Sequence, residues 1–136
     1  MDEKELIKCA LKAREKAYAP YSDFLVGAAL LTDQGTVYEG CNIENASYGA
    51  SNCAERTPVF KAVSEGERNF TAIAIAGGVR GKELTYAYPC GICRQVLREF
   101  CDPEQMWVYV ARSETEYKKF HLSELLPESF GPDFAQ

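Results

Sequence analysis

Apolar residues recur at helical spacing at the start of the chain. Within residues 3–18 they fall on one face of a helix, at Leu6, Ile7, Ala10, Leu11, Ala13 and Ala17. Spacings of three and four residues are those of an amphipathic helix, and Pro20 marks its end. We therefore expect the chain to open with a helix that packs one side on a core.

The next two stretches predict a β-hairpin. Residues 24–31 form an uninterrupted apolar run, which is typical of a buried strand. Asp33, Gln34 and Gly35 are turn-forming residues. The alternating segment 36–39 then continues the extended pattern toward Ile43, so these two runs are expected to pair.

Beyond the hairpin, helical and extended patterns alternate. After a polar loop at 42–52, we expect a helix at 54–64, a strand at 71–76, a loop at 77–88, a helix at 90–100, strands at 106–110 and 117–122, a helical turn at 124–126 and a tail from Ser129 that is mobile unless another subunit holds it. Only six residues, 111–116, separate the last two strands, so the fourth and fifth strands should be antiparallel. This order predicts a layered α/β fold in one domain spanning residues 1–136.

The composition argues against nucleic-acid and membrane partners. The chain has a formal net charge of −5, whereas nucleic-acid-binding proteins usually carry a basic patch. No stretch approaches the roughly 20 apolar residues that span a bilayer, and the charged N-terminus has no signal-type apolar core. We expect a cytoplasmic protein that acts on a small neutral or cationic molecule.

Three cysteines carry most of the chemical information. Cys53 stands two residues before Glu55, and Pro89 precedes the close pair Cys90 and Cys93. Thiols stay reduced in the cytoplasm, which favours metal ligands over a secreted disulfide scaffold. Catalytic zinc sites use three protein ligands and leave a fourth position for water. A carboxylate that is not a ligand can accept a proton from that water, so the pattern predicts a zinc hydrolase.

Other interpretations of these cysteines stay open. The close pair alone also suits buried core thiols or a redox dithiol. A structural zinc would need a fourth ligand, for which the candidates are Cys41, Cys101 and His121. Closed sites usually combine two close-spaced ligand pairs, and no second pair exists in the sequence. The spacing therefore favours a catalytic site over a structural one.

The residues beside the ligands have two interpretations each. Asn52 and Glu55 have the spacing of a capping box, in which the glutamate would only satisfy a helix start. Three thiolates and one Zn²⁺ leave one negative charge in excess, which would weaken the metal's effect on water. We expect Arg56 to donate to the sulfurs and withdraw that charge, with Arg94 as a lesser candidate.

Several stretches resemble the cytidine deaminases, specifically the small homotetrameric three-cysteine type. They are APYSDFLVGAA (19–29), GCNIENA (40–46), NCAERT (52–57), PCGICRQ (89–95), ELLP (124–127) and FGP (130–132). They follow one another in order from one end of the chain to the other, which is more specific than any single motif. The resemblance implies a three-layer α/β/α fold with a five-stranded mixed sheet, in which strands four and five are antiparallel.

The resemblance also implies the role of each site residue. Cys53, Cys90 and Cys93 would bind Zn²⁺, and Glu55 would move protons during attack of water on C4 of cytosine, as in the zinc deaminases generally. Asn42 and Glu44 would hydrogen-bond the ribose, Phe24 would pack on the base, and the backbone of Ala54 and of 88–89 would contact the pyrimidine edge. Tyr48 and Phe130 would enter a neighbouring subunit's site.

The implied activity is deamination of cytidine and 2′-deoxycytidine in pyrimidine salvage. Glu44 would repel a phosphate, which favours a nucleoside over a nucleotide or polynucleotide. Deaminases of other aminopyrimidines, polynucleotide deaminases and a non-catalytic zinc-stabilised binding module are the alternatives. Tyr88 departs from the family, which commonly has serine there, and a slightly long loop at 77–86 and Pro58 depart as well.

Overall fold

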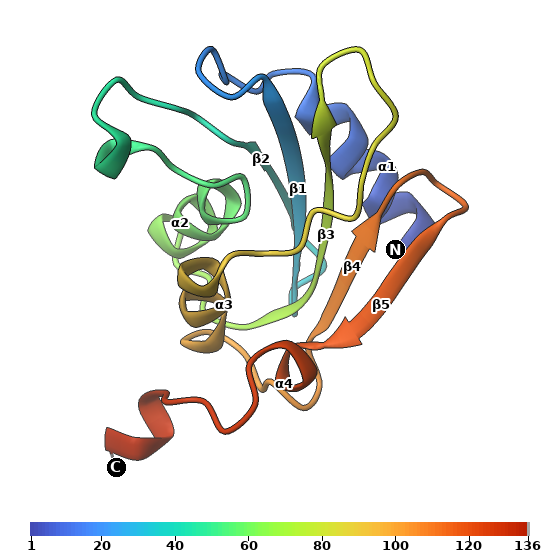
Figure 1. Cartoon of the computed structure of the whole chain (residues 1–136). Coiled ribbons are helices and arrows are strands. Elements are labelled where there is room, and N and C mark those ends of the chain that lie inside the picture. The colour runs from blue at the N-terminus through green and yellow to red at the C-terminus, as the bar shows by residue number, and fades with distance from the viewer. Residues whose placement is uncertain (136) are drawn as a thin grey trace.

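The computed structural model describes residues 1–135, which form a mixed sheet covered by helices (Figure 1). The elements in chain order are α1 (Glu3–Arg14), β1 (Phe24–Thr32), β2 (Val37–Cys41), the 3₁₀ turn η1 (Tyr48–Ala50), α2 (Arg56–Ser64), β3 (Phe70–Val79), α3 (Gly91–Arg98), β4 (Trp107–Ala111), β5 (Tyr117–His121), α4 (Leu122–Leu125) and the 3₁₀ turn η2 (Pro132–Ala135).

The five strands lie in the order β2-β1-β3-β4-β5. β1 is antiparallel to both β2 and β3, β3 and β4 are parallel, and β4 and β5 are antiparallel. The parallel pair is joined through α3, as a parallel connection requires a crossover. The predicted α/β class, the mixed five-stranded sheet and the antiparallel fourth and fifth strands are confirmed.

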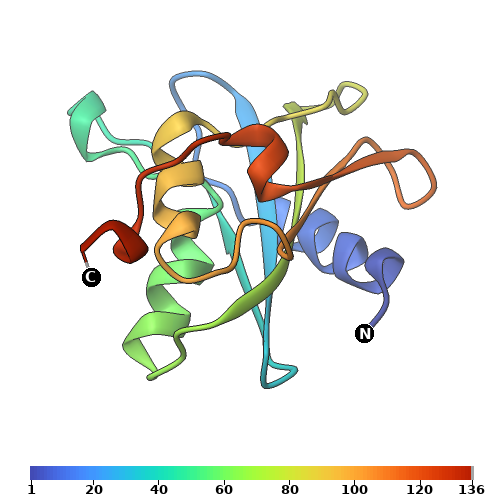
Figure 2. The ribbon, with the colours of Figure 1, turned by 90° about the horizontal axis from the view of Figure 1, so that it is seen from below.

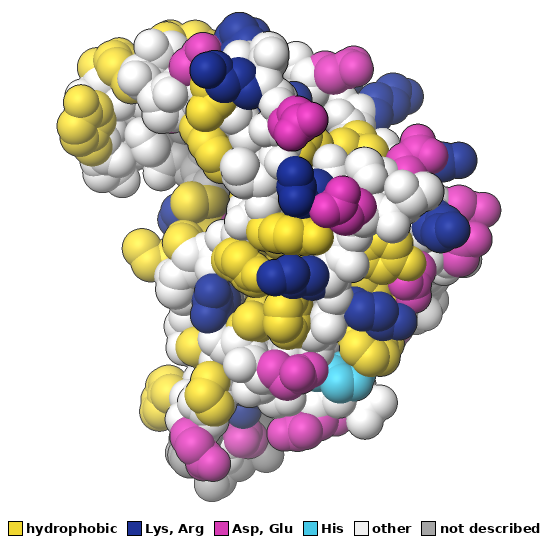
Figure 3. All heavy atoms as spheres, turned by 45° about the vertical axis from the view of Figure 1, so that its right-hand side comes forward, with side chains coloured by type: hydrophobic (Ala, Val, Ile, Leu, Met, Phe, Trp, Pro, Cys, Tyr) yellow, Lys and Arg dark blue, Asp and Glu magenta, His cyan; other side chains and the backbone are white. Residues whose placement is uncertain are grey.

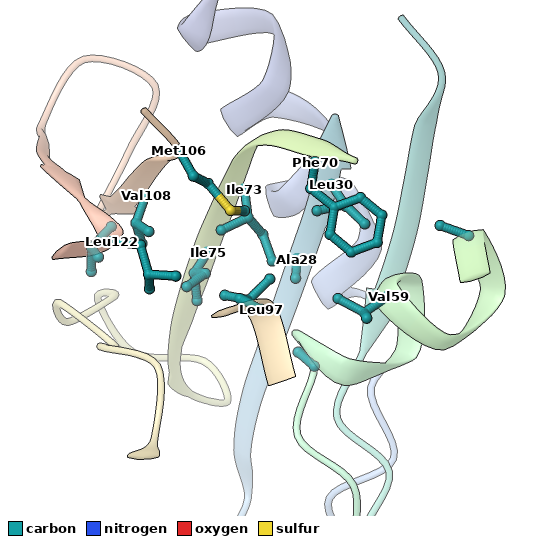
Figure 4. Packing of buried hydrophobic residues seen from close by; sticks show 13 residues of the cluster. Ala28, Leu30, Val59, Phe70, Ile73, Ile75, Leu97, Met106, Val108 and Leu122 are labelled. Carbon is teal, nitrogen blue, oxygen red and sulfur yellow. The ribbon is translucent and has the colours of Figure 1, made fainter. Parts of the chain in front are cut away.

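The two faces of the sheet carry different side chains because successive residues of β3 point to opposite faces. Ile73 and Ile75 point to the face covered by α2 and α3, where Val59 and Leu97 complete the main core (Figure 4). Ala72, Ala74 and Ala76 point to the other face, where α1 packs through a set of small and branched residues, Leu6, Ile7 and Ala10. Figure 2 shows the strands between α1 on one side and α2 and α3 on the other. The layers are thus α, β and α.

The predicted boundaries shift where local contacts outweigh the apolar pattern. The first helix ends at Arg14 instead of continuing to residue 18, because the next backbone N–H groups bond three residues back and that of Tyr18 donates to the carbonyl oxygen of Asn42 at 3.0 Å. The Arg14 guanidinium donates to the carbonyl oxygens of Leu25 and Gly78, both at 2.8 Å. β3 is longer than expected and reaches Val79 through two glycines.

The C-terminal segment is held by its own chain. Arg98, at the end of α3, donates to Ser129 Oγ at 2.8 Å and to Asp133 Oδ1 at 2.6 Å. Gln95 Nε2 donates to the carbonyl oxygen of Phe130 at 2.9 Å. Contacts within the chain thus hold the tail from residue 129, whereas the prediction required another subunit to hold it.

Candidate metal centre and its cavity

Three sulfur atoms converge where α2 and α3 begin. The Sγ atoms of Cys53 and Cys90 are 3.7 Å apart, and those of Cys90 and Cys93 are 3.4 Å apart. All three lie within 4.8 Å of one another, and no other His, Cys, Asp or Glu of residues 1–135 joins the group. Tetrahedral zinc with bonds of about 2.3 Å to sulfur places sulfurs roughly 3.8 Å apart. The cluster therefore fits one such ion.

Helix α3 brings two of these sulfurs together. Cys90 is the N-cap residue of α3, and its Sγ accepts from the backbone N–H of Cys93 at 3.4 Å. Pro89 suits the position before the helix because no amide donor is needed there. The free N–H groups and partial positive charge of a helix start stabilise thiolate, the form of cysteine that binds metal.

Arg56 lies against the sulfurs, as the sequence predicted. Its Nη2 donates to Cys53 Sγ at 3.3 Å, and this bond raises the pKa of Arg56. The hydrogen bond from Cys93, followed by that from Arg56, lowers the pKa of Cys53, while the same contact with Cys53 raises the pKa of Cys93. These contacts favour thiolate at Cys53, the form of cysteine that binds metal.

Arg94, the lesser candidate, bonds elsewhere. Its Nε donates to the carbonyl oxygen of Pro89 at 2.7 Å, and its Nη1 donates to that of Leu125 at 2.6 Å. This guanidinium thus ties the residue before Cys90 to the end of α4. It supports the ligand loop through the backbone.

Glu55 is a buried carboxyl beside the sulfur cluster. It is only 4% exposed, and burial, followed by the negative charge of Cys53, raises its pKa to about 7. Glu55 is itself the N-cap residue of α2, and its side chain makes no capping hydrogen bond within the described chain. The capping-box interpretation is therefore wrong. A buried carboxyl of this kind can hold or release a proton near neutral pH.

A cavity of about 290 Å³ opens beside this carboxyl. It is lined by Phe24, Val26, Asn42, Cys53, Ala54, Glu55, Ala87, Tyr88 and Cys90. Its volume is near the lower end of small-molecule sites. Of the predicted substrate-binding residues, the fold brings Phe24, Asn42 and Ala54 together here. A larger hollow of about 520 Å³ near the C-terminal segment contains none of the predicted site residues.

Asn42 joins the loop after β2 to the start of β1. Its Oδ1 accepts from the backbone N–H of Val26 at 2.9 Å, and its Nδ2 donates to the carbonyl oxygen of Phe24 at 2.8 Å. An amide side chain offers two donors and two acceptor positions. One of each is left at the cavity wall.

Glu44 and Tyr48 lie in a different hollow, of about 300 Å³. The Glu44 carboxylate accepts from the backbone N–H groups of Tyr21 and Ser22 at 2.9 and 3.2 Å, and from Ser22 Oγ. These bonds, the hydroxyl's first, lower the pKa of Glu44. Sequence reasoning missed Ser22, because a lone serine in a polar turn has no distinctive signal.

The remaining predicted residues lie away from the cavity. Phe130 is 71% exposed beside α3. The alternative zinc ligands Cys41, Cys101 and His121 do not reach the sulfur cluster within the described residues. His121 stacks on Trp107 at 3.8 Å between ring centroids, and burial raises the pKa of Cys101 to about 12. The three-ligand interpretation is the one that this geometry supports.

Sheet, helix starts and sulfur cluster together define a class of protein. It is an α/β protein in which three cysteine sulfurs that could hold a metal ion lie beside a buried acid, and catalytic zinc sites use three protein ligands. The sequence pattern of the family described as the cytidine and deoxycytidylate deaminase zinc-binding region matches residues 1–110. The chain belongs to this family.

Individual relatives agree with this assignment. The chain is 48% identical over 133 residues to the cytidine deaminase of Sporosarcina psychrophila, covering 98% of this chain and 94% of the relative. It is 51% identical over 130 residues to that of Halalkalibacterium halodurans, with 96% and 95% covered. The crystal structure of cytidine deaminase from Burkholderia pseudomallei matches with a TM-score of 0.85 at 47% identity, covering 96% of this chain and all of that one. The predicted family resemblance is confirmed.

No helix in the described part of the chain is both long and apolar enough to cross a membrane.

Proposed function

We propose that this protein is a zinc-dependent deaminase that converts cytidine and 2′-deoxycytidine to uridine and 2′-deoxyuridine with release of ammonia. The observation that carries the proposal is the buried Glu55 carboxyl, which shares one small cavity with Cys53 and Cys90. The names of the relatives, which are cytidine deaminases, support the substrate class. Pyrimidine salvage is the metabolic role that follows from this reaction.

Cys53, Cys90 and Cys93 would hold one Zn²⁺, which as a Lewis acid would make water acidic enough to attack at neutral pH. Arg56 withdraws excess negative charge from Cys53. The thiols must stay reduced to bind metal, which is consistent with a cytoplasmic location.

Glu55 carries the proton transfers. Its carboxylate takes a proton from the attacking water and delivers it to N3 of cytosine as the C4–O bond forms. A second proton, from the new C4 hydroxyl, passes through the same carboxyl to the exocyclic amine. The C4–N bond then breaks as the C4 carbonyl forms, and ammonia leaves. Burial suits Glu55 to this exchange because it raises the pKa to about 7, where the carboxyl can both take and give a proton near neutral pH.

Substrate binding uses the cavity walls and the neighbouring hollow. Phe24 would pack on the base, the backbone of Ala54 would contact the pyrimidine edge, and the free positions of Asn42 would bind a ribose hydroxyl. The two oxygens of the Glu44 carboxylate offer about four acceptor positions. Three hydrogen bonds from Tyr21 and Ser22 fill three of them. One position is left for a hydroxyl of the sugar.

Tyr48 and Phe130 would complete the cavity of a neighbouring subunit in a homotetramer. Both side chains are largely exposed and lie outside the cavity of their own chain. A small nucleoside is the proposed partner, and neither nucleic acid nor a membrane is expected to bind.

The test is ultraviolet loss of cytidine with purified protein, alongside Glu55→Gln and, as a matched control, Glu114→Gln at an exposed turn position. We expect zinc near one per chain in all three proteins. Loss of general acid–base catalysis should lower kcat by about 10²- to 10⁴-fold in E55Q only.

Three outcomes would contradict the proposal. Zinc without turnover of any aminopyrimidine nucleoside would indicate a binding module. Turnover of single-stranded polynucleotide or another aminopyrimidine, but not of cytidine, would indicate a different deaminase. Full activity in E55Q would remove Glu55 from the reaction.

A further inference from the structure

The segment before Cys90 forms one wall of the cavity and is supported from two sides. Ala87 and Tyr88 line the cavity. On one side this segment packs on the end of β3, where the backbone N–H of Thr85 donates to Gly77 O at 3.0 Å. A Cβ at Gly77 would lie 2.8 Å from the Cβ of Ala87, so the contact is close.

The second support comes from the edge strand β5. Lys118 Nζ lies 4.5 Å from the ring centroid of Tyr86 and 5.9 Å from that of Tyr88. It also donates to Tyr88 Oη at 3.2 Å. Phe120, on the same side of β5, lies 6.0 Å from the Tyr88 ring between centroids. Figure 3 shows Lys and Arg side chains over a group of hydrophobic side chains on this part of the surface.

The surroundings of Lys118 differ from those of its neighbour. Lys119 points to the opposite face of β5, where it forms a salt bridge with Glu3 at 2.9 Å and lies over Trp107. Lys118 forms no salt bridge with any described residue. Its contacts are with two tyrosine rings and one hydroxyl, and a cation over aromatic faces is attracted to them. The position of this lysine is therefore tied to the cavity wall.

We propose that Lys118 is a positioning residue that fixes the Tyr88 wall of the cavity and thereby sets the affinity for the nucleoside. The inference rests on the proposed function of the cavity. Lys118 is absent from the cavity lining and from the sulfur cluster. Its loss should loosen substrate binding and leave the proton transfers at Glu55 unchanged.

The experiment compares Lys118→Met, which keeps an apolar stem and removes the charge, with Lys119→Met as the matched control on the same strand. Lys118→Arg keeps a cation over the rings and tests rescue. For each protein, KM and kcat for cytidine are measured, together with amide hydrogen exchange of the peptide spanning residues 84–90.

A cation–π contact and one hydrogen bond correspond to about a threefold to tenfold change in KM. We expect that increase in K118M, with kcat within about twofold of the parent and faster exchange at 84–90. K119M should match the parent in KM and in exchange at 84–90, and K118R should restore most of the affinity.

Each contrary outcome is distinguishable. Equal KM and exchange in K118M and K119M would overturn the positioning role while leaving the deaminase proposal intact. Faster exchange in K118M with unchanged KM would show that the wall is braced but does not set affinity, which also overturns it. A parent protein inactive on nucleosides would refute the proposed function itself, and the affinity role with it.

Discussion

At the scale of single residues, the role of Arg56 depends on one hydrogen bond from its guanidinium to the sulfur of Cys53. The bond to Cys53 Sγ is 3.3 Å long, and the buried Nε of the same side chain has no hydrogen-bond partner among residues 1–135. Arg94 also lies close to a ligand in the sequence, directly after Cys93, but bonds two carbonyl oxygens instead. Adjacency along the chain could not separate the two, because the direction of a side chain depends on its helix.

Replacing Arg56 by Gln should weaken metal binding. The substitution keeps a donor but removes the positive charge, and loss of such an outer partner lowers metal affinity by about 10- to 100-fold. Competition with a chromophoric zinc chelator measures this change. Arg80→Gln, which removes an exposed pair with Asp23, is the control and should bind zinc like the parent. Equal affinity in R56Q would show that the sulfurs need no charge compensation.

At the scale of elements, the packing of α1 on the sheet depends on a glycine at one position of β1. A Cβ at Gly27 of β1 would lie 2.1 Å from Ala10 O and 2.4 Å from the backbone nitrogen of Arg14. Both atoms belong to the backbone of α1, so they cannot move without the whole helix. The sequence showed Gly27 only as part of an apolar run, and its function as a contact point required the fold.

Gly27→Ala should therefore destabilise the protein by about 1–3 kcal/mol or more, the usual cost of overpacking. Urea unfolding followed by circular dichroism measures the loss. Gly49→Ala is the matched control, since nothing lies within 4 Å of its added Cβ. Equal midpoints for the two variants would mean that α1 can move away from β1 at little cost.

For the whole molecule, the exposed apolar side chains suggest assembly. Phe60 and Ile92 are exposed and line one apolar groove on the side of α2 and α3, and Gln95 of that groove also holds the segment that carries Phe130. Contiguous exposed apolar surface commonly marks an interaction site. The proposed homotetramer would cover this surface and share its cavities.

Light scattering should give four times the chain mass of 15.2 kDa. Phe60→Glu should lower that mass, because a buried charge in an apolar contact is costly, and cytidine turnover should fall with it if the cavities are shared. Lys61→Glu, at a neighbouring exposed position of α2, is the control for added negative charge. A mass equal to one chain for the parent would refute the shared roles of Tyr48 and Phe130.

The sequence alone singled out the cysteines of the candidate metal centre and predicted the class of fold. Spacing brought out Cys53, Cys90 and Cys93, because ligands at helix starts leave a local pattern, and the alternation of helical and extended stretches predicted the layers. The tertiary structure alone decided which side chains meet across long separations. It placed Glu44 in a hollow next to the cavity, not in the cavity wall, and set Lys118 against Tyr88. Such contacts depend on strand register and helix packing, which no local pattern encodes.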